Sequence, residues 1–148
     1  VAGRGNPKRY LALAKRLGLK GRLRFMGMWP NVEELYAAAD AFVLPTLYDP
    51  FANTCLEAMA AGLSIITSAQ NGASELIEDG RSGIIVKDPT DPFELGERLS
   101  ELFGERRRSM GEEARRVAER FPIGRYAQET VKVYREVLEE KPCRPRLS

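Results

Sequence analysis

The sequence contains no histidine and only two cysteines among its 148 residues. Without histidine, these residues cannot supply a histidine general base, a histidine metal ligand or a Ser-His-Asp triad. The two cysteines, Cys55 and Cys143, lie far apart, and neither their number nor their spacing indicates a zinc site or a disulfide framework. Cys55 lies in an apolar helical pattern, which favours a small buried residue and a reducing, cytoplasmic setting.

Long hydrophobic runs and a large excess of one charge are missing as well. No apolar stretch approaches the ~18 residues of a membrane span, and the first residues do not resemble a signal peptide. The 23 basic and 21 acidic residues give a net charge of +2, which offers no argument for a nucleic-acid partner. With 43% hydrophobic and 30% charged residues, the composition is that of one globular domain.

The chain starts abruptly. Val1 and Ala2 lead directly into a glycine-rich stretch at 3–7, which is typical of the last step of a strand and its exit loop. We therefore expect that the sequence begins inside a longer polypeptide and that the first strands of its sheet precede Val1.

Short apolar segments alternate with amphipathic ones along the chain. Strands are expected at 23–26, 41–44, 64–67 and 83–86. Helices are expected at 7–17, 32–39, 53–61, 74–77, 92–103, 106–120 and 123–140. Strands that alternate with helices at such short intervals indicate a parallel sheet. We predict an α/β fold with a Rossmann-like, doubly wound parallel sheet and additional C-terminal helices.

The loop after the strand at 41–44 carries the most informative pattern. Asp49 precedes the helix at 53–61, and Glu57 follows eight positions later, inside the helix. At 100° per residue, Asn53, Thr54 and Glu57 share one side of this helix. Its apolar residues lie on the other side: Leu56, Met59 and Ala60, with Cys55 next to them. Glu57 should therefore be exposed to solvent near the start of the helix.

The start of this helix is suited to an anion. Its free backbone N–H groups and partial positive charge favour a phosphate or diphosphate. The small side chain of Ala52 lets a ligand approach the backbone, and a nearby carboxylate such as Glu57 can accept two hydrogen bonds from a ribose diol. The pattern thus predicts a nucleotide site beyond the carboxyl ends of the strands.

The same segment resembles the signature of retaining glycosyltransferases of group 1, which have two facing Rossmann-like domains (the GT-B architecture). Their C-terminal, donor-binding domain carries an acidic residue and a glutamate separated by seven residues. The matching positions here are Asp49, Phe51, Ala52 and Leu56-Glu57-Ala58-Met59-Ala60. The resemblance continues through 21–27, 34–40 and 72–83. Asp49 stands where the family usually has glutamate, and Ala52 where it usually has glycine.

This resemblance implies roles for individual residues. Glu57 would hold the ribose hydroxyls of the donor and Asp49 the hydroxyls of its sugar, which makes these two the expected catalytic residues. Fixed dipoles would stabilise the departing diphosphate, with no cofactor and no metal. The expected donor-binding residues are Gly27, Met28, Phe51, Ala52, Asn53, Thr54 and Glu57.

The resemblance also implies partners. The donor would be a sugar nucleotide such as a UDP-sugar, and the acceptor a glycan; Asp49-Pro50-Phe51 with Asn53 resembles in particular the enzymes of lipopolysaccharide-core synthesis. The N-terminal acceptor domain and the diphosphate-binding Arg and Lys of the family would lie before Val1. We therefore expect residues 1–148 to be a truncated C-terminal domain that is inactive alone and works in the cytoplasm, at the inner face of the membrane.

Three alternatives remain open at this level. A flavodoxin-like regulatory or nucleotide-binding module would share the fold without transfer activity; Lys87 follows a strand as such a module requires, but its early cluster of acidic residues is not visible. A purely structural domain would leave the polar side of the helix at 53–61 without a purpose. The arginines at 106–108 and 115–116 indicate either a solvated helix face or a patch that contacts anionic lipid.

Overall fold

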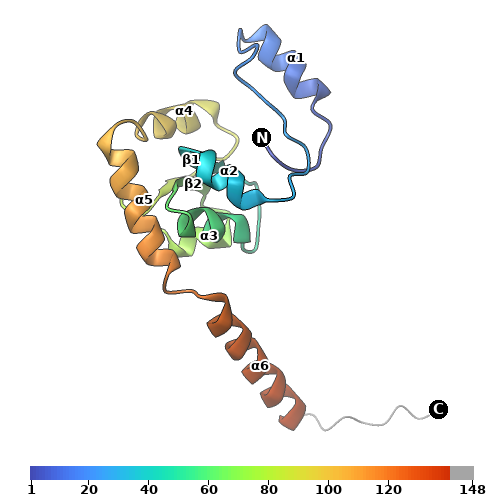
Figure 1. The fold of residues 1–148 in the computed structure, drawn as a ribbon, viewed down its shortest axis with the longest axis vertical. Coiled ribbons are helices and arrows are strands. Elements are labelled where there is room, and N and C mark those ends of the chain that lie inside the picture. The colour runs from blue at the N-terminus through green and yellow to red at the C-terminus, as the bar shows by residue number, and fades with distance from the viewer. Residues whose placement is uncertain (141–148) are drawn as a thin grey trace, which may run out of the picture. The chain divides into compact units, whose positions relative to one another are not determined.

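A computed structural model describes residues 1–140 (Figure 1). Cys143 lies outside this part of the chain. The structure divides into two compact units, the first at 1–38 and the second from residue 39 onward. Of the helices described in the two units, none combines the length and apolar character that a membrane crossing requires.

The first unit contains the helices α1 (Lys8–Arg16) and α2 (Val32–Ala38). The Asn6 side chain accepts a hydrogen bond from the Lys8 N–H at 3.1 Å. The strand predicted at 23–26 was wrong. Among residues 1–140 this segment pairs only with the first residues of the chain: the Met26 N–H donates to the Val1 carbonyl, and Ala2 forms a single bridge with Gly27. A partner of this length is too short for a strand ladder.

The second unit is built on a parallel sheet of three strands in chain order: β1 (Ala41–Leu44), β2 (Ser64–Ser68) and β3 (Ile84–Val86). All five residues of β2 are buried, as expected for a central strand of a parallel sheet. The sequence predicted burial on both faces for β1 too, but Val43 is 38% exposed and the other three residues of β1 are only partly buried.

Helices pack on this sheet and continue beyond it. After β1 comes α3 (Asn53–Ala60), and after β2 a short 3₁₀ helix, η1 (Gly72–Leu76). After β3 the chain forms α4 (Pro92–Ser100), α5 (Glu105–Ala118) and α6 (Ile123–Glu140). The core combines β2, β3 and α5 through Ile66, Ile84, Val86 and Met110, with Leu102 from the connection between α4 and α5. The α/β class, the parallel sheet and the additional C-terminal helices are thus as the sequence predicts.

Close backbone approach brings α5 against the end of α3. A Cβ atom on Gly111 of α5 would lie 2.2 Å from the carbonyl oxygen of Gly62, so only glycine fits there. At the start of α4, the Asp91 carboxylate accepts a hydrogen bond from the Phe93 N–H at 2.8 Å and caps the helix, with Pro92 in its first turn. The Asp91-Pro92 pair predicts this helix start from the sequence, whereas the close approach at Gly111 could not be predicted from it.

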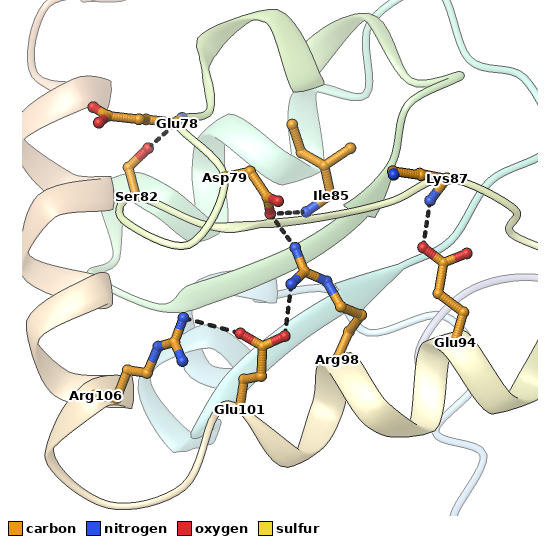
Figure 2. Close-up of polar contacts among 9 residues, drawn as sticks. All are labelled: Glu78, Asp79, Ser82, Ile85, Lys87, Glu94, Arg98, Glu101 and Arg106. Carbon is orange, nitrogen blue, oxygen red and sulfur yellow. Dashed lines mark hydrogen bonds and ion pairs between the residues drawn. The ribbon is translucent and has the colours of Figure 1, made fainter.

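A chain of polar contacts ties β3 to α4 and α5 (Figure 2). The Asp79 carboxylate accepts hydrogen bonds from the Ile85 N–H at 2.9 Å and from Arg98. Arg98 also pairs with Glu101 at 2.6 Å, which in turn pairs with Arg106 at 2.9 Å. Burial of Arg98 opposes its charge, but Glu101 and Asp79 outweigh this effect and raise its pKa. This network holds α4 and the start of α5 against β3.

Candidate functional site

The site predicted from the sequence lies in two loops that follow β1 and β2. The carboxyl ends of parallel neighbours meet at one edge of a sheet, so the loops at 45–52 and 69–71 leave the sheet side by side. They are joined by backbone hydrogen bonds: the Asp49 N–H donates to the Gln70 carbonyl at 3.2 Å, and the Gly72 N–H donates to the Asp49 carbonyl at 2.9 Å. The two loops therefore form one continuous surface.

Asn71 connects the second loop to the start of α3. Its side chain is fully buried, and all four of its hydrogen-bonding positions are used. Oδ1 accepts from the backbone N–H groups of Ala52 and Ala73, both at 3.1 Å. Nδ2 donates to Thr67 Oγ1 at 2.8 Å and to Cys55 Sγ at 3.4 Å. Sequence reasoning missed this residue.

The loops are also in van der Waals contact at a glycine. A Cβ atom built on Gly72 would lie 1.9 Å from the carbonyl oxygen of Pro50. Because that oxygen belongs to the backbone, it cannot move aside as the end of a flexible side chain would. The absence of a side chain at Gly72 is what lets the second loop press against the first.

Asp49 shapes its own loop. Its Oδ1 accepts a hydrogen bond from the Phe51 N–H at 3.0 Å, which is the geometry of an Asx turn. The side chain is half-buried, whereas that of Phe51, two residues further along, is 39% exposed. Oδ1 of Asp49 is therefore occupied by a hydrogen bond within the loop. The contact with the donor sugar that the sequence predicts for Asp49 would then have to be made by its other carboxylate oxygen.

At the start of α3, the backbone N–H groups fall into two sets. Those of Phe51 and Ala52 are bound by Asp49 and Asn71. Those of Asn53 and Thr54 have no acceptor among the described residues, as is usual in the first turn of a helix. Ala52 is buried and has φ −74° and ψ 99°, angles that any residue adopts, so alanine fits in place of the family's glycine. Asn53 and Thr54 are thus the amides that a ligand can reach.

The polar side of α3 faces solvent as predicted. Asn53, Thr54 and Glu57 are all exposed, and Glu57 lies one turn beyond the first residue of the helix. The inner side differs from the prediction at two positions: Ala60 is exposed, whereas Ala58 is fully buried; Leu56 is partly buried. The difference arises because α3 packs against α5 as well as against β2, which turns its buried face.

Cys55 lies on the buried side of α3, as the sequence predicts, with its side chain fully inaccessible. Burial raises the pKa of its thiol, and hydrogen bonds with Thr67 and Asn71 oppose this only in part. A buried, neutral thiol is not a nucleophile. Cys55 therefore belongs to the frame of the site and not to its chemistry.

The other two predicted donor-binding residues, Gly27 and Met28, belong to the first unit. Met28 is 66% exposed, and Gly27 has a positive φ of 66°. Next to them, Glu34 accepts hydrogen bonds from Asn31 at 3.0 Å and from the indole N–H of Trp29 at 3.2 Å, which lower its pKa. The role of Gly27 and Met28 in donor binding stays a prediction.

The arginines of α5 are all paired with carboxylates. Arg106, Arg107, Arg108, Arg115 and Arg116 contact Glu101, Asp40, Glu112, Glu119 and Glu113 respectively. This arrangement favours the solvated helix face over a patch for anionic lipid. No three His, Cys, Asp or Glu side chains within residues 1–140 cluster closely enough to hold a metal ion.

A parallel sheet with two interlocked loops at its carboxyl edge, and a helix start open beside them, defines a Rossmann-like domain. Comparison with known proteins confirms the family that the sequence resembles. Residues 1–105 match the family model of the glycosyl transferases group 1, and the chain belongs to this family.

Individual relatives support this assignment. An uncharacterized glycosyltransferase of Methanocaldococcus jannaschii is 32% identical over 145 residues, which cover 94% of this chain and 37% of that protein. Lipopolysaccharide glucosyltransferase WaaG of Escherichia coli is 33% identical over 99 residues, covering 67% and 26%. The crystal structure of the Anabaena protein HepE in complex with UDP-glucose matches with a TM-score of 0.81 and 25% identity, covering 91% and 40%. The chain thus spans well under half the length of these relatives.

Proposed function

We propose that this chain is the donor-binding domain of a glycosyltransferase that moves a sugar from a nucleoside diphosphate to an acceptor. The observation that carries the proposal is the exposed carboxylate of Glu57, one helical turn from the open amides of Asn53 and Thr54. A carboxylate suits a ribose diol, and helix amides suit a diphosphate. Both parts of a nucleotide donor then have a partner on the same face of α3.

Asp49 and the donor sugar complete the site. The half-buried carboxylate of Asp49 lies in the loop that leads into α3, where the family has its sugar-contacting acid. The N–H groups of Asn53 and Thr54, together with the partial positive charge of the helix start, would stabilise the negative charge that develops on the departing diphosphate. No step in this scheme needs a metal ion or another cofactor.

The relatives favour a particular donor and acceptor. HepE is crystallised with UDP-glucose, and WaaG takes part in lipopolysaccharide biosynthesis. We therefore propose a UDP-sugar as donor, a lipopolysaccharide or a related glycan as acceptor, and transfer with retention of configuration. An N-terminal acceptor-binding domain would be needed for turnover, so residues 1–148 alone should bind the donor without transferring its sugar.

The free, buried thiol of Cys55 is consistent with a reducing compartment, and we propose that the enzyme works in the cytoplasm. A lipid-linked acceptor would bring it to the inner face of the membrane. Because the arginines of α5 are paired with carboxylates, that association would depend on the acceptor rather than on a free basic surface.

Calorimetric titration with uridine, guanosine and adenosine diphosphates tests the proposal. The chain should bind one of them, and Glu57→Gln should weaken that binding by about 10- to 100-fold, the equivalent of a hydrogen bond to a charged group. Glutamine keeps the shape of the side chain, so folding should be unaffected.

Glu97→Gln is the matched control, because Glu97 is an exposed carboxylate on a different helix, α4. This variant should bind like the wild type. Equal affinity of the wild type and Glu57→Gln, or no binding of any of the three diphosphates, would refute the proposed donor site.

A further inference from the structure

Asn71 lies beneath the surface of the proposed donor site. Its side chain has no solvent-accessible surface, so it cannot contact a bound donor. Its Oδ1 nevertheless holds the N–H of Ala52, the residue directly before α3. The next two N–H groups along the chain, those of Asn53 and Thr54, are the ones open to a ligand. The direction of these amides therefore depends on a peptide group that Asn71 fixes.

The chemistry of this position calls for an amide. On one side, two backbone N–H groups, of Ala52 and Ala73, require an acceptor. On the other side, the Thr67 hydroxyl already donates its hydrogen to the Leu44 carbonyl at 2.9 Å, so its oxygen requires a donor. An asparagine side chain supplies both an acceptor and donors, whereas an aspartate lacks the donors and an aliphatic side chain has neither donor nor acceptor.

The same contacts join three elements of the site. Thr67 lies in β2 and bonds to the last residue of β1, Cys55 lies in the first turn of α3, and Ala73 is the second residue of η1. The backbone bridge between Asp49 and Asn71 adds the loop of the predicted sugar-binding acid to this frame. Asn71 is thus the point at which the ends of both strands, the Asp49 loop and the start of α3 are fixed together.

We propose that Asn71 is a positioning residue for donor binding: its buried amide orients the first N–H groups of α3 toward the diphosphate of the donor. This inference rests on the proposed function. It goes beyond it because it makes the affinity for the diphosphate part depend on a residue that the donor never touches.

The test compares two ligands, the diphosphate that the wild type binds most tightly and its nucleoside without phosphate. Asn71→Ala should lower the affinity for the diphosphate by about tenfold, the equivalent of one lost hydrogen bond, and leave the affinity for the nucleoside nearly unchanged. Hydrogen exchange of the Ala52 amide should accelerate in the same variant, and this measurement needs no ligand.

Two further variants separate positioning from stability. Thr67→Val removes the hydroxyl that orients the amide of Asn71. This variant should change the ratio of the affinities for diphosphate and nucleoside in the same direction as Asn71→Ala, but by a smaller factor. It replaces Asn71→Ala as the test if that variant does not fold. Ser64→Ala removes a buried hydrogen bond at the opposite end of β2, to the Arg107 carbonyl, and should leave the ratio unchanged.

The outcomes are distinguishable. If the wild type binds no diphosphate, the proposed function fails and the positioning role fails with it. If the wild type binds but the ratio of affinities is unchanged in both Asn71→Ala and Thr67→Val, the proposed function stands and the positioning role is refuted. An equal change of the ratio in Ser64→Ala would also refute it, because a general loss of stability would then explain the effect.

Discussion

Replacing Gly72 by alanine should disturb the site and the fold together. Its new Cβ would lie 1.9 Å from the carbonyl oxygen and 2.8 Å from the carbonyl carbon of Pro50, against the 3.4 Å at which ordinary contact begins. The two loops must therefore separate by more than an ångström. That movement stretches the hydrogen bond from the Gly72 N–H to the Asp49 carbonyl, now 2.9 Å.

The expected cost follows from this geometry. Forcing an extra carbon into a packed interior costs ~1–3 kcal/mol, and we expect the upper half of this range because the obstacle is backbone. The φ of Gly72 is not in the left-handed region, so the clash alone accounts for the loss. Urea unfolding at 25 °C measures the change in free energy, and titration with the bound nucleoside diphosphate measures the change in affinity.

Two other Gly→Ala variants make the result specific. Gly111→Ala meets the Gly62 carbonyl oxygen at 2.2 Å, at the far end of α3, so it should lose similar stability but keep the affinity of the remaining folded protein. Gly96→Ala enters open space inside α4 and should stabilise the fold by ~0.5–1 kcal/mol. The reasoning is wrong if Gly72→Ala matches the wild type in both assays, or if Gly111→Ala loses as much affinity as Gly72→Ala.

Two further predictions concern stability alone. Asp91→Ala removes the cap of α4 and should cost ~0.5–2 kcal/mol, seen as a lower urea midpoint at an unchanged m value; no change would mean that the hydrogen bond to the Phe93 N–H contributes nothing. Burial raises the pKa of Cys55 above its ordinary value of 9.0, so as the pH rises the unfolded chain loses this proton before the folded one does. The contribution of the protonated Cys55 thiol to the free energy of unfolding is therefore complete below pH 9.0 and is lost above it, by at most ~1.4 kcal/mol per pH unit. The stability of Cys55→Ala should fall less steeply at alkaline pH than that of the wild type. If both proteins lose stability equally with pH, the pKa of Cys55 is not raised by burial.

Local patterns were sufficient for most of the elements. The apolar run at 41–44 is the strand β1 as predicted, and the Asp91-Pro92 pair starts α4. The face of α3 that carries Glu57 followed from helical periodicity, and its exposure agrees. Periodicity did not show that α3 packs on α5 too, so it placed Ala60 inside and overlooked Ala58.

The frame of the site was beyond the reach of such patterns. Asn71 and Ala52 are 19 residues apart, and their contact exists only because β1 and β2 are parallel neighbours. A signal was present in Thr67 and Ser68, the polar residues at the carboxyl end of β2, since buried hydroxyls at a strand end need partners. The prediction of a strand at 23–26 was wrong for the same reason: a strand needs a neighbouring strand to pair with, and the sequence of the segment itself does not show whether one is present.

The separation of the buried Asn71 from the exposed residues of α3 also affects which substitutions this domain can accept. The side chains open to solvent, Phe51, Asn53, Thr54 and Glu57, are different from those that lock the loops in place. Under the proposed function, substitutions among the open set would alter which donor is recognised, and most of the folding free energy should be retained because substitutions of surface residues usually change stability little. A library restricted to these four positions would therefore test whether nucleotide and sugar preference can change on an intact scaffold.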